Sequence, residues 1–228
     1  TSGPTLPDGR SSHCLVNLHD GRIMILGGHL LSYHKNISMY DSDNDTFTPG
    51  PSLIYDRSHA GCTLFLSPLH NNRPVVLIAG GYDQSPGAYL NTMDYITIAS
   101  TGDATDFGDL TVGRRGLSSA SSSVRGLFAI GRDSGGSKRN YIDYITIAST
   151  GNATDFGDTS VSGAIQRCAA VSNQTRGMWA GGFTPGSPAT LQNIIQYVTI
   201  SSTGNTKDFG ERSNESLTLA VDVTFALL

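Results

Sequence analysis

The strongest constraint on the fold of this chain is a sequence motif, here called the phrase, that occurs twice with one difference. The phrase runs from Tyr95 to Asp109 and returns from Tyr144 to Asp158, with Asn152 in the place of Asp103. A looser copy spans Tyr197 to Glu211. Self-similarity at a period of about 50 residues is typical of propellers, solenoids and other arrays built from one repeated supersecondary unit. The repeat therefore restricts the fold to this group of architectures.

Single residues also recur along the whole chain. An arginine opens each unit, and a short apolar run then ends on two glycines or on Ile130-Gly131. The arginines are Arg10, Arg57, Arg115 and Arg167; the aromatic positions that follow are Tyr40, Tyr95, Tyr144 and Tyr197, then Phe47, Phe107, Phe156 and Phe209. We expect these aromatic residues to be structural. The spacing predicts one repeat domain, 1–228, with units at about 10–56, 57–114, 115–166 and 167–215 and partial units at 1–9 and 216–228.

The second unit shows the pattern of four short strands. Residues 60–66 are apolar and β-branched, and 74–79 form a continuous apolar run, as expected of a strand that is buried on both faces. Residues 94–98 alternate between polar and apolar, and a turn at 100–103 leads into a fourth strand near Phe107. No segment has a convincing helical period. The sequence therefore predicts an all-β chain.

The order of these residues resembles the kelch repeat, and the first unit carries the resemblance most fully. It contains Arg10-Ser-Ser-His13, the run from Asp20 to Gly27-Gly28, Tyr40-Asp41 and Phe47. Phenylalanine stands where the family usually has tryptophan, and the later units have Ile or Val after the tyrosine. The resemblance implies a β-propeller of kelch-like four-stranded blades, with about four repeats. It is specific for the fold and says little about function.

The wording of the later units resembles repeats in virion proteins of tailed marine phages. The matching phrase, Tyr-Ile-Thr-Ile-Ala-Ser-Thr-Gly-Asn-Ala-Thr-Asp-Phe-Gly-Asp, stands at 144–158. All six histidines, from His13 to His70, lie in the first third of the chain, whereas the near-identical phrases begin at Tyr95. Two explanations remain open: uneven divergence of one repeat family, or a fusion of two repeat sources near Leu90 to Tyr95.

Composition argues against several classes of function. A net charge of −4 with 15% charged residues argues against nucleic-acid binding, which needs clustered Lys and Arg. No apolar run approaches the roughly 20 residues that span a bilayer. The three cysteines do not indicate a disulfide framework, and a start at Thr1 without a signal-like segment suggests a processed or excised piece. Five sequons weakly favour an extracellular or virion-associated location: Asn36, Asn44, Asn152, Asn173 and Asn214.

The repeated arginines are the candidate ligand-facing residues. A ring of guanidinium groups on one propeller face would suit carboxylates or acidic sugars, because Arg binds such groups through paired hydrogen bonds. The alternative is structural, with each side chain buried and donating to backbone carbonyls of neighbouring blades. Both interpretations stay open for Arg10, Arg57, Arg115 and Arg167.

Other residues suggest metal or oxidase chemistry, and the repeat offers a simpler explanation for each. His13 and Cys14, with His59 and Cys62, are of the types that ligate zinc or copper. Together with Tyr40 and Tyr95, the same histidines suggest a copper-radical oxidase, a class that also uses kelch-like propellers. Residues at a spacing of three suit calcium: Asp103, Asp106, Asp109, Asn152, Asp155 and Asp158. Because all of these recur as repeat or turn positions, we predict no metal, cofactor or catalytic residue.

Both ends of the chain resemble partial units, so closure of the ring is an open question. We expect the alternating segment Leu217 to Phe225 to pair with the opening region, Thr5 to Leu15, in the same chain or in a partner. The sequence thus predicts a non-enzymatic binding or structural propeller that engages a protein or a glycan, in a virion or on a surface, and that could self-associate through sheet edges. The alternatives are a repeat or chimeric chain without a ligand, and an oxidase or hydrolase.

Overall fold

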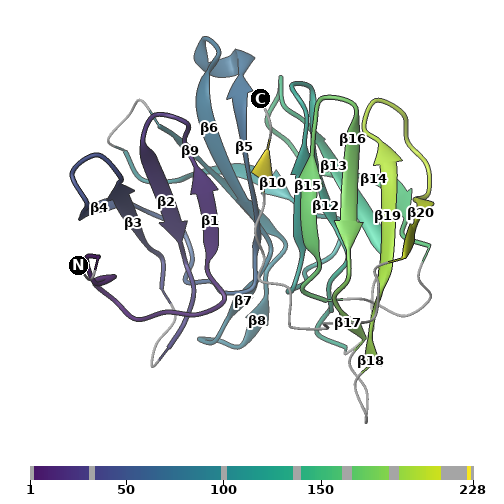
Figure 1. The fold of residues 1–228 in the computed structure, drawn as a ribbon, viewed down its shortest axis with the longest axis horizontal. Coiled ribbons are helices and arrows are strands. Elements are labelled where there is room, and N and C mark those ends of the chain that lie inside the picture. Colours follow the sequence, from purple (N-terminus) through teal and green to yellow (C-terminus); the bar gives the residue numbers. More distant parts are fainter. Residues whose placement is uncertain are drawn as a thin grey trace.

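The computed structural model describes residues 3–30, 34–98, 102–135, 140–160, 166–184, 190–211 and 225–226. Within them the chain forms four antiparallel sheets, each built on four strands (Figure 1). Each sheet is one blade, and the blades are numbered 1 to 4 in chain order. Apart from one 3-10 turn at Pro68–His70, the described elements are strands, so the all-β prediction is confirmed.

The strands of each blade follow chain order. Blade 1 contains β1 (Cys14–Asn17), β2 (Arg22–Leu26), β3 (Asn36–Asp41) and β4 (Thr46–Ser52). Blade 2 contains β5 (Gly61–Ser67), β6 (Arg73–Ala79), β9 (Thr92–Thr97) and β10 (Thr105–Asp109). Blade 3 contains β11 (Ser118–Ser121), β12 (Arg125–Ala129), β13 (Tyr141–Thr146) and β14 (Thr154–Asp158). Blade 4 contains β15 (Ala169–Ser172), β16 (Arg176–Ala180), β19 (Ile194–Thr199) and β20 (Lys207–Glu211).

The blades stand side by side, and the first strand of each lies next to the first strands of its neighbours. Strand β5 packs beside β1 and β11, and β15 packs beside β11. In Figure 1, blade 1 (purple) lies at one end of the row and blade 4 (yellow-green) at the other. Two short hairpins project at the lower end of that view: β7 (Tyr82–Asp83) with β8 (Ala88–Tyr89), and β17 (Phe183–Thr184) with β18 (Thr190–Leu191).

The hydrophobic core lies between blades. One cluster joins Met24 and Leu26 of blade 1 to Val76 and Ile78 of blade 2. The next two join blade 2 to blade 3 and blade 3 to blade 4 in the same way. Since strands β6 and β12 are covered on both faces, their apolar residues alternate between two of these clusters, which explains the continuous apolar run at 74–79.

In blades 2, 3 and 4 the turn between the third and fourth strands binds the blade to the one before it. In blade 4, Gly204 N donates to Phe156 O (2.7 Å), Thr206 N donates to Asp158 O (2.9 Å), and Asn205 Oδ1 accepts from Asp158 N (2.9 Å). The turn of blade 3, 151–153, makes the same three bonds with blade 2, and the turn of blade 2 makes the last two with Ser52. We call this arrangement the inter-blade clasp. It explains why the Thr-Gly-Asx phrase recurs almost unchanged.

One expected repeat position differs in blade 1. Tyr95, Tyr144 and Tyr197 pair with the strand residue three positions before the glycine pair, and in blade 1 this place belongs to Met39, which pairs with Met24. Tyr40 is one position further and pairs directly with Phe47 across a shorter turn. Because successive strand residues face opposite sides of a sheet, Tyr40 is not equivalent to the other three tyrosines.

The two ends of the chain do not pair as expected within the described residues. Phe225–Ala226, strand β21, runs parallel to β15 and pairs with Val171 and Ser172 of blade 4, not with residues 5–15. Residues 217–224 lie outside the described residues. No described sheet combines strands of blades 1 and 4. Among the described elements there is also no helix with the length and apolar character to cross a membrane.

Candidate functional site

The opening arginines of blades 1 to 3 are buried inside the molecule. Arg10 Nη1 donates to the carbonyls of Gly27 (3.2 Å) and Asn36 (2.9 Å), and Arg57 Nη1 donates to Gly80 O (3.1 Å). The third buried arginine is Arg114, whose Nε donates to Ile130 O (2.9 Å), and not Arg115. Each side chain thereby satisfies carbonyls at the end of the second strand. The structural interpretation therefore applies to Arg10 and Arg57, and in blade 3 it belongs to the residue before Arg115.

Two of these arginines form fully buried ion pairs that also fix the preceding blade. Arg57 Nη2 lies 2.9 Å from Asp94 Oδ2, and Arg114 Nη1 lies 3.1 Å from Asp143 Oδ2. The same carboxylates also accept hydrogen bonds from the backbone of the segment that connects the preceding blade. Ile54 N donates to Asp94, and Thr111 N donates to Asp143. A charge that is buried and paired in this way is closed off from solvent and from a ligand, although Arg57 Nε and Asp94 Oδ1 have no hydrogen-bond partner among the described residues. These residues hold the blades together.

Arg115 and Arg167 instead belong to the loop segment that follows the buried arginine position. Arg115 pairs through its backbone with Arg132, as Ser11 pairs with His29 and Ser58 with Tyr82. Arg167 occupies the repeat position that follows this paired residue. The equivalent residues of the other blades are Ser12, His59 and Gly116, and all four have a positive φ of about 55 to 74°. The repeat thus brings Arg115, Arg132 and Arg167 to one end of the blades. We call this end the loop face.

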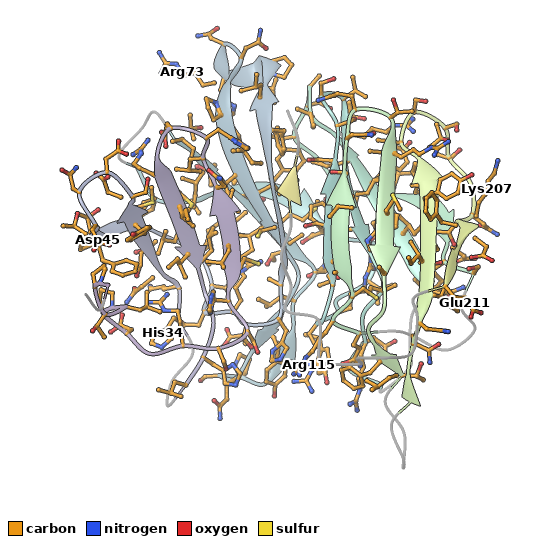
Figure 2. The ribbon with its side chains drawn as sticks, in the orientation of Figure 1. His34, Asp45, Arg73, Arg115, Lys207 and Glu211 are labelled. Atoms are coloured by element: carbon orange, nitrogen blue, oxygen red, sulfur yellow. The ribbon has the colours of Figure 1, made fainter. Side chains whose placement is uncertain are left out.

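Aromatic rings lie beside two of the loop-face arginines. The Arg115 guanidinium carbon lies 4.9 Å from the ring centre of Tyr82 and 5.2 Å from that of Tyr89, in the hairpin β7–β8. Arg167 lies 5.7 Å from the ring of Phe183. Figure 2 shows Arg115 at the lower end of the molecule, where the hairpins of Figure 1 project. Such stacking orients a guanidinium group and leaves its N–H edge available to an acceptor.

His59 connects these arginines to blade 1. Its Nε2 lies 2.7 Å from Arg167 Nη2 and 3.0 Å from Ser12 Oγ, and its Nδ1 lies 3.0 Å from Ser58 Oγ. Because a guanidinium can only donate, Nε2 accepts and the ring proton lies on Nδ1. Burial, together with the charges of Arg167 and Arg115, lowers the pKa of His59 to about 3. The ring is therefore neutral at pH 7 and adds no charge of its own.

The loop face carries cations without matching carboxylates. Within the described residues, neither Arg115, Arg132 nor Arg167 forms an ion pair, and Arg132 Nε is buried without a hydrogen-bond partner. The chain as a whole has a net charge of −4, so this positive cluster is local. Chemically it can bind a carboxylate, and the neighbouring rings can contact a flat apolar surface.

The residues considered for metal or oxidase chemistry have other roles in the structure. His13, Cys14 and Cys62 line a gap of about 10 Å³, roughly the space of one water molecule, and the Cys14 thiol donates to Ala60 O (3.2 Å). His59 faces Arg167, which disfavours a cation. Asp103, Asn152 and Asn205 serve the inter-blade clasp. In blades 2, 3 and 4 an aspartate accepts from the glycine N–H of the fourth strand, namely Asp106, Asp155 and Asp208.

The repeated phenylalanines differ in exposure. Phe107 and Phe156 are buried, Phe47 is half-buried, and Phe209 is 56% exposed. In blades 2 to 4 the phenylalanine lies edge-on to the tyrosine of the third strand, at 5.9 to 6.1 Å between ring centres. The aromatic pair is thus a constant part of these blades, and its burial depends on whether another blade covers it.

A second hollow lies between blades 1 and 2. It is a groove of about 470 Å³ lined by Met24, Met39, Ile96 and Ile98, with Arg22 and Asp41 among its polar residues. Its size is within the range of small-molecule sites. At this junction Met39 stands in the position that a tyrosine occupies in the other blades. The smaller side chain fills less of the space between blades 1 and 2.

Sequence reasoning missed part of the loop face. Arg132, Tyr82 and Phe183 each follow the glycine pair or its remnant directly, in the place that His29 takes in blade 1. The signal was available, since large polar or aromatic residues recur at this position next to an invariant local turn.

Comparison with known proteins supports the fold and goes no further. No protein-family model matches the chain, and no curated protein matches it. Among solved structures, 210 chains match. One of these is the structure of YjhT, which superposes with a TM-score of 0.72 at 12% sequence identity over 93% of this chain and 74% of that chain. At this identity the likeness shows the fold alone: the chain is a β-propeller-type array of four-stranded blades.

Proposed function

We propose that this chain is a non-enzymatic binding module whose loop face recognises a carboxylate-bearing glycan. The observation that carries the proposal is the cluster of Arg115, Arg132 and Arg167, which lack carboxylate partners among the described residues. Two of them lie beside aromatic rings, Arg115 beside Tyr82 and Tyr89 and Arg167 beside Phe183. A sugar acid presents a carboxylate to guanidinium groups and an apolar ring face to aromatic side chains. The neutral His59 holds Arg167 in place by accepting its hydrogen bond.

The repeat phrase suggests where such a module would act. Its resemblance to repeats of phage virion proteins supports a virion-associated or surface-associated role, in which several copies would bind a surface glycan with combined strength. A kelch-like repeat in the first unit is compatible with the same role. An oxidase or hydrolase lacks support, because the Cys14 thiol and the carboxylates of Asp103, Asp106 and Asp155 are engaged in hydrogen bonds that build the blades.

A glycan array that contains uronic-acid and neutral oligosaccharides tests the proposal. We expect binding to acidic glycans only, and we expect Arg115→Ala and Arg167→Ala each to weaken it by roughly 10-fold or more, as for the loss of a charge-assisted hydrogen bond. Arg73→Ala is the matched control, because Arg73 is exposed at the opposite end of the molecule from Arg115 (Figure 2). Equal binding to neutral glycans, or equal loss in the control, would contradict the proposal. Binding to acidic peptides alone would move the assignment to a protein partner.

A further inference from the structure

The outer edge of blade 4 has the same kinds of groups as the edge through which blade 3 contacts blade 4. At the junction of blades 3 and 4, Phe156 is 2% exposed and lies 5.9 Å from Tyr144. The guanidinium of Arg125 lies 4.5 Å from the Tyr144 ring and donates to Ile200 O of blade 4 (2.9 Å). The inter-blade clasp completes this junction. Three kinds of contact thus act together: an aromatic wedge, an arginine and a set of backbone bonds.

A glycine makes room for the clasp. Gly157 has φ +140°, and a Cβ atom there would lie 2.5 Å from Gly204 O of the next blade. A Cβ atom on Gly108 would collide in the same way with Gly151 O at the junction of blades 2 and 3. Because a side chain at either position would collide with backbone, glycine at this place is a requirement of the junction and not only of the local bulge.

Blade 4 repeats every one of these features where no described residue uses them. Arg176 lies 4.7 Å from the Tyr197 ring, and Phe209 stands edge-on to Tyr197 at 6.1 Å. Gly210 has φ +140° with its N–H bonded to Asp208, as Gly157 has with Asp155, but nothing lies within 4 Å of a Cβ placed on it. Phe209 is 56% exposed, and Arg176 is exposed as well. Figure 2 labels Lys207 and Glu211, the ends of β20, at the outer border of the molecule.

We infer that this edge, formed by Arg176, Tyr197, Phe209, Gly210 and Glu211, is a docking surface for one further blade of this repeat type. We call it the docking edge. Its partner is defined by chemistry: a four-stranded blade whose last turn reads Gly-Asx followed by a small residue. The glycine N–H would donate to Phe209 O, the Asx oxygen would accept from Glu211 N, and the next N–H would donate to Glu211 O, as in the three-bond clasp at 204–206.

A second copy of this chain does not meet that description. Its blades 2, 3 and 4 already use their turns within the chain. Only the turn of blade 1, 41–45, is free of a preceding blade, and it has no glycine. There, Asp41 accepts from Asp43 N, Asn44 N and Asn44 Nδ2, so its oxygens are occupied within the turn. The docking edge therefore fits a further Gly-Asx blade better than it fits blade 1 of another copy.

The test inserts a second copy of residues 159–211 between Glu211 and Arg212 of the full chain, so that the copy follows Glu211 as residue 159 follows Asp158. We expect the amide of Glu211 to become protected from hydrogen exchange. We also expect Phe209→Ala to lower the melting temperature of the extended chain by roughly 5 to 10 °C and to leave that of the parent chain almost unchanged, because only the extended chain covers the ring. An extended chain with Gly210→Val at the docking edge itself is the control, because a side chain there would collide with the turn of the inserted blade, as a Cβ atom on Gly157 would collide with Gly204 O.

Several results would overturn the inference. One is a Phe209→Ala variant that behaves alike in both chains while the Glu211 amide stays unprotected. Another is an extended chain that loses the fold of the parent. Sedimentation of the parent chain provides the third: if it self-associates and Phe209→Ala abolishes the association, the occupant is a second copy and not a Gly-Asx blade.

Discussion

Phe156 and Phe209 hold the same repeat position, yet the first is 2% and the second 56% exposed. The side chain and its tyrosine partner are equivalent in both blades, so the difference comes from the presence or absence of a covering blade. A residue in a repeat protein therefore has to be judged with its neighbouring unit and not only by its place in its own unit.

Phe156→Ala should destabilise the fold by about 3 to 5 kcal/mol, the usual cost of removing a buried aromatic ring. Phe209→Ala should change the free energy of unfolding by no more than about 0.5 kcal/mol, as for an exposed residue. Urea unfolding followed by the fluorescence of Trp179 measures both. Similar values for the two variants would show that the ring of Phe209 is covered in solution.

His59 makes the free energy of unfolding depend on pH. Its pKa is lowered to about 3 in the folded chain, and burial also lowers the pKa of His13. An unfolded histidine titrates near 6.5, so between about pH 3 and 6.5 the unfolded chain binds more protons at residue 59 than the folded chain. The lowered pKa of His13 acts in the same direction. Their contribution to stability is therefore complete above pH 6.5 and falls as the pH is lowered.

His59→Gln should flatten this part of the profile. Each proton taken up on unfolding changes the free energy of unfolding by up to about 1.4 kcal/mol per pH unit. We therefore expect the loss of stability between pH 6.5 and 4 to be smaller in the variant than in the unchanged chain. His19→Gln is a suitable control because His19 is exposed on a turn. An unchanged slope for His59→Gln would mean that the ring is accessible to protonation in the folded state.

At the scale of strands and turns, the inter-blade clasp links local geometry to the assembly of blades. Gly157 and Gly210 share the same φ of +140° and the same N–H bond to a preceding aspartate. Substitution by alanine therefore carries the same intrinsic backbone strain at both positions. The two glycines differ in their surroundings. The backbone of the next turn lies close to Gly157, whereas no described residue lies close to Gly210.

Gly157→Ala should therefore be more destabilising than Gly210→Ala, by roughly 1 to 3 kcal/mol, the usual cost of forcing extra atoms into a packed site. Thermal unfolding of the two variants in parallel gives the difference directly. If the two losses are equal, the strain of the bulge dominates and the clasp can move aside.

The strand pattern could be predicted from the sequence, whereas the register of several repeat positions could not. The apolar run at 74–79 and the repeated phrase define strands and turns by local chemistry, and the structure has them there. Arg114 and Arg115 are adjacent and chemically identical, so only the three-dimensional pairing shows that the first is buried. The neighbours Asp41 and Phe47 predict that Tyr40 is equivalent to the other repeat tyrosines, but the shorter turn of blade 1 shifts it by one place.

The candidate site was predictable only in part for a related reason. The sequence predicts that Arg115 and Arg167 belong to one ring with Arg10 and Arg57, whereas the structure separates the buried pair, Arg10 and Arg57, from the loop-face pair. Arg132, Tyr82 and Phe183 join the site through backbone pairing with residues 17 to 24 positions earlier. Their shared place after the glycine pair can be found in the sequence, but only the fold shows that this place lies beside the loop-face arginines.

At the scale of the whole molecule, the blades form a row in which each described core cluster joins only neighbours. Within the described part of the chain, blades 2 and 3 have a blade on both sides, whereas blades 1 and 4 have one. In arrays of this kind stability is approximately a sum of unit and nearest-neighbour terms, so units at the ends open more readily than units in the middle.

Hydrogen exchange should reveal this order. Val75 to Ala79 in β6 and Leu127 to Ala129 in β12 are at most 1% exposed, and their amides should exchange only through opening of the whole molecule. Strand β16 is equivalent to β12 but lies in blade 4, where Met178 and Ala180 are half-buried. Its amides should exchange faster, by a factor of about 10 for every 1.4 kcal/mol of missing neighbour contact. Measurement by NMR or mass spectrometry under native conditions would distinguish the strands. Equal rates in β6, β12 and β16 would contradict the prediction, since they would mean that the four blades unfold as one cooperative unit.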